Sequence, residues 1–140
     1  HPAIRSLSRV MVGIGLFVLV LGTLVTGSGP HSGDSAVDHR LPFDVRTISW
    51  LHADAVLLFI GVMIGFLVAL RVSGGPRKSV TRAWILIGVS LAQGVIGYLQ
   101  YFTGVPWLLV LLHLGGACAV WIALVAAHLS LRRRGGVVAV

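Results

Sequence analysis

Four long apolar runs dominate this chain and restrict what it can fold into. They cover about residues 7–26, 48–70, 83–102 and 106–131. Each run is long enough to cross the roughly 30 Å hydrocarbon core of a bilayer as an α-helix. Because lipid offers no hydrogen-bond partner to an open backbone, a spanning segment must satisfy its own amides as a helix. The sequence therefore predicts an all-α, integral membrane four-helix bundle.

The composition agrees with a membrane protein of one domain, residues 1–140. The chain is 56% hydrophobic and only 11% charged, whereas a soluble domain is about 25% charged. Its net charge of +7 does not indicate nucleic acid, because the basic residues stand at the ends of the apolar runs. We expect the lipid bilayer as a partner and no nucleic acid. Cys118 is the single cysteine, so an internal disulfide is excluded.

The basic residues also predict the orientation. Nine of the eleven fall at one end of the runs: Arg5, Arg9, Arg71, Arg77, Lys78, Arg82, Arg132, Arg133 and Arg134. The positive-inside rule places this end, and both termini, in the cytoplasm. The loop of residues 27–47 then lies outside. It carries two arginines and three aspartates that face each other: Arg40, Arg46, Asp34, Asp38 and Asp44.

Two histidines stand near the starts of the second and fourth runs. His52 precedes Arg71 by nineteen residues, and His113 precedes Arg132 by the same number. Nineteen helical residues span roughly 28 Å, close to the thickness of the hydrocarbon core. We therefore expect both histidines at equal depth near the outer boundary. Two neutral imidazoles at equal depth on neighbouring helices can hold a ligand between them.

A faint internal repeat relates the two histidines. Residues 21–24 (LGTL) resemble residues 96–99 (IGYL), and each segment is followed by a run that carries a histidine. Both hairpins run in the same direction, so the repeat predicts a two-fold axis along the membrane normal. Such an axis makes His52 and His113 mates.

A pair of histidines favours a haem iron over zinc. A closed zinc site takes four ligands, and neither cysteine nor glutamate lies nearby. Ligation of a haem by two histidines leaves the iron no open position, which suits electron transfer better than oxygen chemistry. The alternative for each histidine is a hydrogen bond to a neighbouring helix.

Other residues are candidates for the same site. Small residues flank the histidines, as a flat macrocycle requires: Ala53, Ala55, Gly115, Gly116 and Ala117. Close helix packing accounts for them equally well. Arg40 and Arg46, with His39, are candidates to bind haem propionates, since guanidinium pairs well with carboxylate. The alternative is that the loop arginines pair with the loop's own aspartates.

Several further polar residues have simpler interpretations. Gln93, Tyr98 and Gln100 give the third run a polar streak, which predicts hydrogen bonds between helices. Asp54 is two residues from His52 and points to a different helix face. We expect surface or interface positions for His1, His31 and His128.

Longer motifs resemble the haem A synthase family, specifically its C-terminal half in the actinobacterial style. The matching pieces are residues 22–34 (GTLVTGSGPHSGD), 40–44 (RLPFD), 51–54 (LHAD), 93–104 (QGVIGYLQYFTG) and 112–113 (LH). The resemblance covers nearly the whole chain. It implies a multi-pass protein of the bacterial plasma membrane that is one half of an eight-helix, pseudo-symmetric protein.

The resemblance also implies a function. The family oxidises the C8 methyl of haem O to a formyl group, which makes haem A for cytochrome oxidase. Its N-terminal half binds haem O and carries a Glu-x-x-His-Arg type motif, and its C-terminal half binds haem b through two histidines, here His52 and His113. This chain has no glutamate, and Ser49 stands three residues before His52. The resemblance therefore assigns the chain to the haem b half, inactive alone, and it lacks the loop cysteine pair of some members.

The implied partners are the N-terminal catalytic half, with haem O synthase and cytochrome oxidase assembly factors as further candidates. We expect the chain to be part of a longer polypeptide. Two alternatives stay open. One is a stand-alone membrane cytochrome with two histidine ligands, acting as an electron-transfer subunit. The other is a haem-free four-helix subunit or chaperone.

Overall fold

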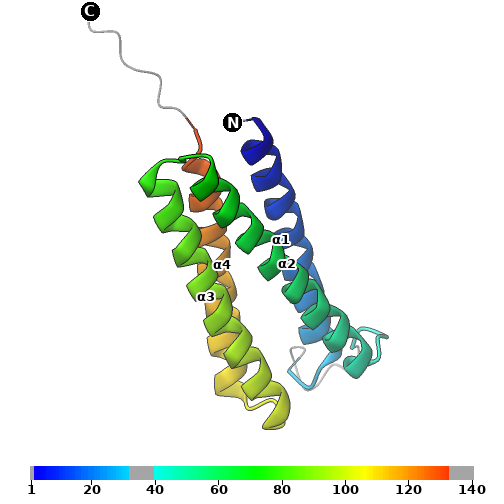
Figure 1. The fold of residues 1–140 in the computed structure, drawn as a ribbon. Coiled ribbons are helices and arrows are strands. Elements are labelled where there is room, and N and C mark those ends of the chain that lie inside the picture. Colours follow the sequence, from blue (N-terminus) through cyan, green and yellow to red (C-terminus); the bar gives the residue numbers. More distant parts are fainter. Residues whose placement is uncertain (1, 32–39, 133–140) are drawn as a thin grey trace, which may run out of the picture.

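The computed structural model of the chain describes residues 2–31 and 40–132. Within these ranges it has four helices, α1 (Pro2–Ser28), α2 (Val45–Val72), α3 (Arg77–Phe102) and α4 (Trp107–Leu129), which alternate in direction (Figure 1). The predictions for six residues fall outside the described ranges: His1, Asp34, Asp38, His39, Arg133 and Arg134.

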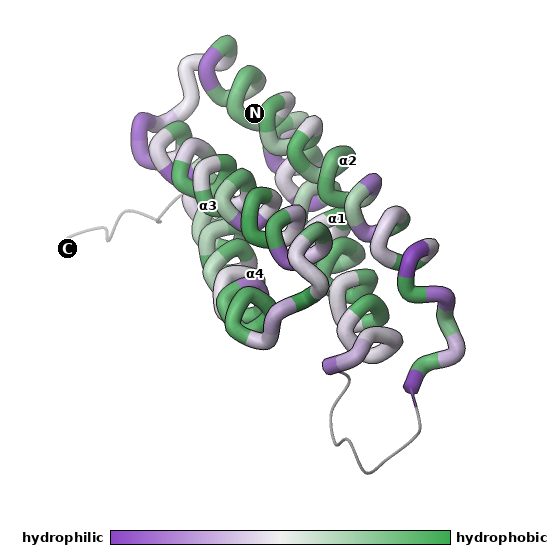
Figure 2. The backbone as a smooth tube through the Cα atoms, turned by 90° about the horizontal axis from the view of Figure 1, so that it is seen from below, coloured by the Kyte–Doolittle hydropathy of each residue, from purple (hydrophilic) through white to green (hydrophobic). Residues whose placement is uncertain are grey.

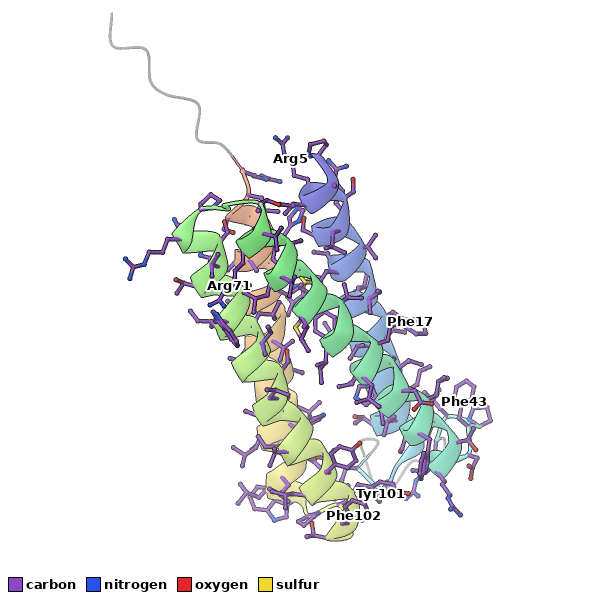
Figure 3. The ribbon with its side chains drawn as sticks, in the orientation of Figure 1. Arg5, Phe17, Phe43, Arg71, Tyr101 and Phe102 are labelled. Carbon is purple, nitrogen blue, oxygen red and sulfur yellow. The ribbon has the colours of Figure 1, made fainter. Side chains whose placement is uncertain are left out.

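All four helices are long and apolar enough to cross a membrane. Large hydrophobic side chains cover their outward surfaces; Phe17, for example, is 49% exposed and points away from the bundle (Figure 3). Most residues along the helices are hydrophobic, and hydrophilic residues are more frequent toward the helix ends (Figure 2). The chain is therefore a multi-pass membrane protein, and the predicted all-α four-helix membrane bundle is confirmed. Its membership of an eight-helix protein stays a prediction.

The helices α1 and α3 begin before the apolar runs that were predicted to start at residues 7 and 83. Serine and basic residues occupy these first turns. They continue the backbone hydrogen bonding of a helix without placing their charges in the hydrocarbon core, because long basic side chains reach the membrane surface. The apolar pattern alone therefore underestimates the length of both helices.

The four helices form a ring of neighbours. Helix α1 packs on α2 and α4, and α3 packs on α2 and α4. Across the ring, α1 does not pack on α3 and α2 does not pack on α4 within the described residues. We call the two ends of the bundle the arginine-rich end and the histidine end. The arginine-rich end carries Arg5 and Arg71, which Figure 3 labels. By their places in the helices it also carries Arg9, Arg77, Lys78, Arg82 and Arg132.

The core common to both hairpins lies toward the arginine-rich end. It joins residues of all four helices, including Met11, Phe66, Leu86 and Leu124, each of which is almost fully buried. A second buried cluster nearer the histidine end belongs to α1 and α2 only. It consists of Leu21, Ile48 and Ala55. In α4 the first buried side chain is Leu124, so residues 107–123 contribute none. The hairpins α1–α2 and α3–α4 accordingly diverge toward the histidine end (Figure 1).

Polar side chains near the arginine-rich end have partners. The Ser8 hydroxyl shares a hydrogen bond of 3.1 Å with Nδ1 of His128. The Ser130 hydroxyl donates to the Ser79 hydroxyl at 2.9 Å. Arg82 donates through Nη1 to a main-chain carbonyl of α4 at 2.7 Å. Such bonds between helices matter in lipid, where no hydrophobic effect holds apolar helix surfaces together.

Helix α1 lies close to its neighbours at Gly15. A Cβ atom added there would lie 3.2 Å from the Phe59 ring of α2 and would overlap the Leu124 side chain of α4. Gly13, on another face of the same helix, has nothing within 4 Å of an added Cβ. Gly15 is therefore required by packing, whereas Gly13 is not.

We expect Gly15→Ala to lower the free energy of unfolding by about 1–3 kcal/mol, because it overpacks the common core. Gly13→Ala is the matched control and should be neutral or stabilising by up to about 1 kcal/mol, since alanine is the better helix former. Thermal unfolding in detergent, followed by circular dichroism, measures both. Equal unfolding temperatures for the two variants would contradict this packing.

Helix α2 begins with an aspartate cap. Asp44 Oδ1 accepts hydrogen bonds from the Thr47 backbone N–H at 2.8 Å and from the Thr47 hydroxyl at 2.6 Å. These two bonds, with the nearby Arg46, hold the pKa of Asp44 below its ordinary value of 3.8. The cap satisfies a donor that the first turn of a helix otherwise leaves open.

Because the folded pKa of Asp44 is the lower one, its contribution is complete well above pH 3.8 and is lost as the pH falls through the folded pKa. We expect faster hydrogen exchange at the Thr47 amide after Asp44→Ala, relative to the intrinsic rate. Asp44→Asn should keep the protection and remove its acid dependence, since asparagine caps as well as aspartate. Protection at Thr47 that is the same in all three proteins would exclude the cap.

Candidate functional site

The two predicted ligands lie at the same end of the bundle. His52 is the eighth residue of α2 and His113 the seventh of α4, and both helices start at the histidine end. Helices α2 and α4 are diagonal in the ring. The expectation that the two histidines lie on neighbouring helices is therefore wrong. Successive helices are neighbours, and α4 returns to α1, so α2 and α4 lie at opposite corners of the ring.

Each imidazole lies over a glycine of the preceding helix. A Cβ added at Gly22 of α1 would lie 3.3 Å from Cε1 of His52. A Cβ added at Gly97 of α3 would lie 3.1 Å from Cε1 of His113. In both cases Nδ1 is the next nearest ring atom, at 3.8 and 3.7 Å. The two hairpins therefore hold their histidines in the same way, as the repeat of residues 21–24 and 96–99 predicts.

The unpartnered polar atoms of the described residues gather in this half of the molecule. Five buried side-chain atoms have no hydrogen-bond partner: Ser28 Oγ, His52 Nδ1, Gln93 Oε1, Gln100 Oε1 and His113 Nδ1. Each such group costs about 1–3 kcal/mol in an apolar interior. The serines and the arginine of the other end, by contrast, have hydrogen-bond partners.

The small residues that the sequence analysis placed beside the ligands serve helix packing. Gly116 lies directly against the Gln93 side chain, and an added Cβ would collide with it. Ala55 is buried against α1 in the cluster that includes Val18. Gly115 has nothing within 4 Å. The alternative of close packing therefore accounts for Gly116 and Ala55, and the glycines that touch the imidazoles are on the helices before them.

The loop arginines lie at the histidine end but not against the histidines. Arg40 precedes α2 and Arg46 is in its first turn, and both side chains are exposed. Arg46 is close enough to Asp44 to lower the pKa of that carboxyl. Asp54 is exposed on α2, away from the buried face, as its spacing from His52 predicts. Both guanidinium groups therefore lie at the surface of this end of the bundle.

A hydrogen bond ties the hairpins together at this end. Nε2 of His31, which follows α1, donates to the Val105 carbonyl at 2.8 Å. Val105 has a φ of 61°, a left-handed conformation that is unfavourable for a β-branched residue. The adjacent Gly104, with a φ of 80°, is also left-handed, so these two residues make the tight turn between α3 and α4. The turn thus presents its carbonyl to the other hairpin.

Among residues 2–31 and 40–132, no group of three or more histidine, cysteine, aspartate or glutamate side chains comes together. Comparison with protein-family models, with curated proteins and with solved structures found no match to this chain. The fold and the site define a membrane four-helix bundle with two histidines near one end, each packed on a glycine of the preceding helix.

Three residues of the site were not assigned a role there from the sequence. Gly22 and Gly97 occupy the same position in the repeated segments 21–24 and 96–99. This shared position is the sequence signal that could have identified them. Gln93 belonged to the polar streak of the third run, and its amide Nε2 donates to the His113 carbonyl at 3.1 Å. That bond confirms the predicted hydrogen bonding between helices for Gln93.

The adjacent glycines of α4 test this arrangement. We expect Gly116→Ala to lower the free energy of unfolding by about 1–3 kcal/mol, because the new methyl group displaces Gln93. Gly115→Ala should be neutral or slightly stabilising. Thermal unfolding of the two purified variants makes the comparison. A larger loss in Gly115→Ala than in Gly116→Ala would show that Gln93 packs elsewhere.

Proposed function

We propose that this chain binds a haem between His52 and His113 and is the haem b half of a haem A synthase. The observation that carries the proposal is the pair of matched imidazoles at the histidine end. They come from diagonal helices, each is packed on a glycine, and each has a buried Nδ1 without a partner. Nothing in the common core fills the region between them, since that core lies toward the other end.

The residues fit a haem better than an isolated metal ion. A closed zinc site takes four protein ligands, whereas a porphyrin supplies four of the six iron ligands and leaves two to the protein. When bound, a haem with two histidine ligands supplies one-electron transfer. The chain's own share is to hold two imidazoles at one depth and to exclude water with the apolar faces of α2 and α4.

Arg40 and Arg46 are the candidates for the propionates. Both are exposed at the end of the bundle that carries the histidines. A guanidinium pairs with a carboxylate through two parallel hydrogen bonds, so an arginine at this surface suits an acidic substituent. In this proposal they hold the polar edge of the macrocycle at the membrane boundary.

The wider role follows from the resemblance. The chain has no glutamate, so oxidation of the C8 methyl of haem O belongs to an N-terminal catalytic half. The half described here contributes electron transfer or structural support in the bacterial plasma membrane. Haem O synthase and cytochrome oxidase assembly factors are the further partners in this proposal. The second candidate is a stand-alone electron-transfer cytochrome, which the same pair of histidines supports.

A reduced-minus-oxidised spectrum of the detergent-purified chain tests the haem site. We expect a low-spin b-type spectrum in the wild type and its loss in His52→Ala and in His113→Ala. His128→Ala is the matched control, since His128 bonds Ser8 near the arginine-rich end, and it should keep the spectrum. Added imidazole should restore the low-spin signal to either ligand variant by filling the space left by the ring.

Circular dichroism of each sample separates loss of haem from loss of fold. A folded wild type without haem, or a spectrum unchanged by both ligand substitutions, would overturn the assignment. Co-expression with a glutamate-bearing catalytic half distinguishes the two candidate roles. Conversion of haem O to haem A that is lost in His52→Ala and in His113→Ala supports the synthase. A haem spectrum without conversion of haem O supports the stand-alone cytochrome.

A further inference from the structure

The two histidines are surrounded differently despite the repeat. On α3, Gln93, Gly97 and Gln100 are spaced by four and three residues, so they share one face of the helix. His113 lies over the middle residue of this stripe. The two amide oxygens, Gln93 Oε1 and Gln100 Oε1, are buried and have no partner. His113 therefore lies on the helix face that also carries two buried acceptors.

The matching stripe of α1 is apolar. When Gly22 is aligned with Gly97, Val18 takes the place of Gln93, and Val25 takes the place of Gln100. Val18 and Val25 pack against the buried cluster of α1 and α2. His52 is thus held against an apolar helix face. The side-chain amides of Gln93 and Gln100 are not required for packing a hairpin of this kind. The α1–α2 hairpin has valines at the matching positions.

Gln93 is accommodated by a second, matched change. When His52 is aligned with His113, Ala55 of α2 takes the place of Gly116 of α4. Gly116 leaves room for the Gln93 amide, which is only 8% exposed and donates to the His113 carbonyl. A buried amide with an open oxygen is costly. The chain buries the Gln93 amide in spite of this cost, and Gly116 makes room for it. We take this combination as a sign that Gln93 has a role at His113.

We infer that Gln93 is a positioning residue whose side-chain Oε1 fixes the His113 imidazole by accepting a hydrogen bond from its Nδ1–H. His52 lacks such a side-chain acceptor, because Val18 stands at the matching position. This inference rests on the haem site proposed above. The two atoms are buried, unpartnered and carried by groups in contact, since the Gln93 amide already bonds the main chain of His113. The terminal torsion of a glutamine is soft, so its oxygen can turn toward the ring.

A hydrogen bond to the far nitrogen of a ligating imidazole fixes the ring and raises its basicity. A more basic ligand favours ferric over ferrous iron. Loss of the bond should therefore raise the reduction potential and speed the displacement of His113 by an added ligand. Loss of such a partner typically weakens metal binding about 10–100-fold. A tenfold change in the ratio of ferric to ferrous binding corresponds to about 59 mV.

The experiment compares three variants of the haem-loaded chain. Gln93→Met keeps the length of the side chain and removes its hydrogen bonding, and Gln93→Val introduces the residue of the matching position on α1. Val18→Ala is the control on the His52 side. The readouts are the midpoint potential, the electron paramagnetic resonance spectrum of the ferric haem and the rate of cyanide binding. Circular dichroism shows whether each variant is folded.

We expect Gln93→Met and Gln93→Val to raise the midpoint potential and to speed cyanide binding about tenfold or more, and Val18→Ala to change neither. A folded Gln93→Met variant with wild-type potential, spectrum and cyanide rate would overturn the positioning role and leave the haem site intact. Equal effects of Val18→Ala and Gln93→Met would also overturn it, because packing would then explain both. A folded wild type without haem would overturn the proposed function and this inference together.

Discussion

The rest of this structure depends on the cost of a polar group that has no partner in an apolar interior. Lipid supplies no hydrogen bonds and no hydrophobic effect between helices. Serines, a histidine and an arginine near one end of the bundle meet this constraint by bonding across helices. At the other end, five buried polar atoms of the described residues are left open. In one half of the molecule these polar side chains are hydrogen-bonded between helices. In the other half, five buried polar atoms have no partner among the described residues.

The repeat explains how the open half is built. Each hairpin places a histidine of its second helix on a glycine of its first, with Gly22 under His52 and Gly97 under His113. Because α2 and α4 lie at diagonal corners of the ring, the two hairpins pack side by side. The common core fixes this arrangement from the arginine-rich end, so the histidine end diverges without loss of the fold. The same arrangement of a histidine on a glycine therefore occurs once in each hairpin.

The departure from the repeat is as informative as the repeat itself. The α1–α2 hairpin closes around its histidine with Val18 and Ala55, whereas the α3–α4 hairpin uses Gln93 and Gly116 at the same positions. A valine and an alanine fill space with dispersion contacts. A glutamine and a glycine fill similar space but add a donor and an acceptor. The two sides of the site consequently differ in chemistry while they share a backbone.

Much of this was determined by the sequence alone: four spanning helices and their alternating direction. These follow from hydropathy and from rise per residue, which are local properties of a helix in lipid. The equal depth of His52 and His113 stays a prediction. The tertiary structure decided what the histidines face. It placed α2 diagonal to α4, put Gly97 rather than Gly115 against an imidazole, and matched Gln93 with Gly116. The reason is that the rotation of a helix about its own axis is set by packing against its neighbours, and apolar runs with similar residues on every face leave that rotation open.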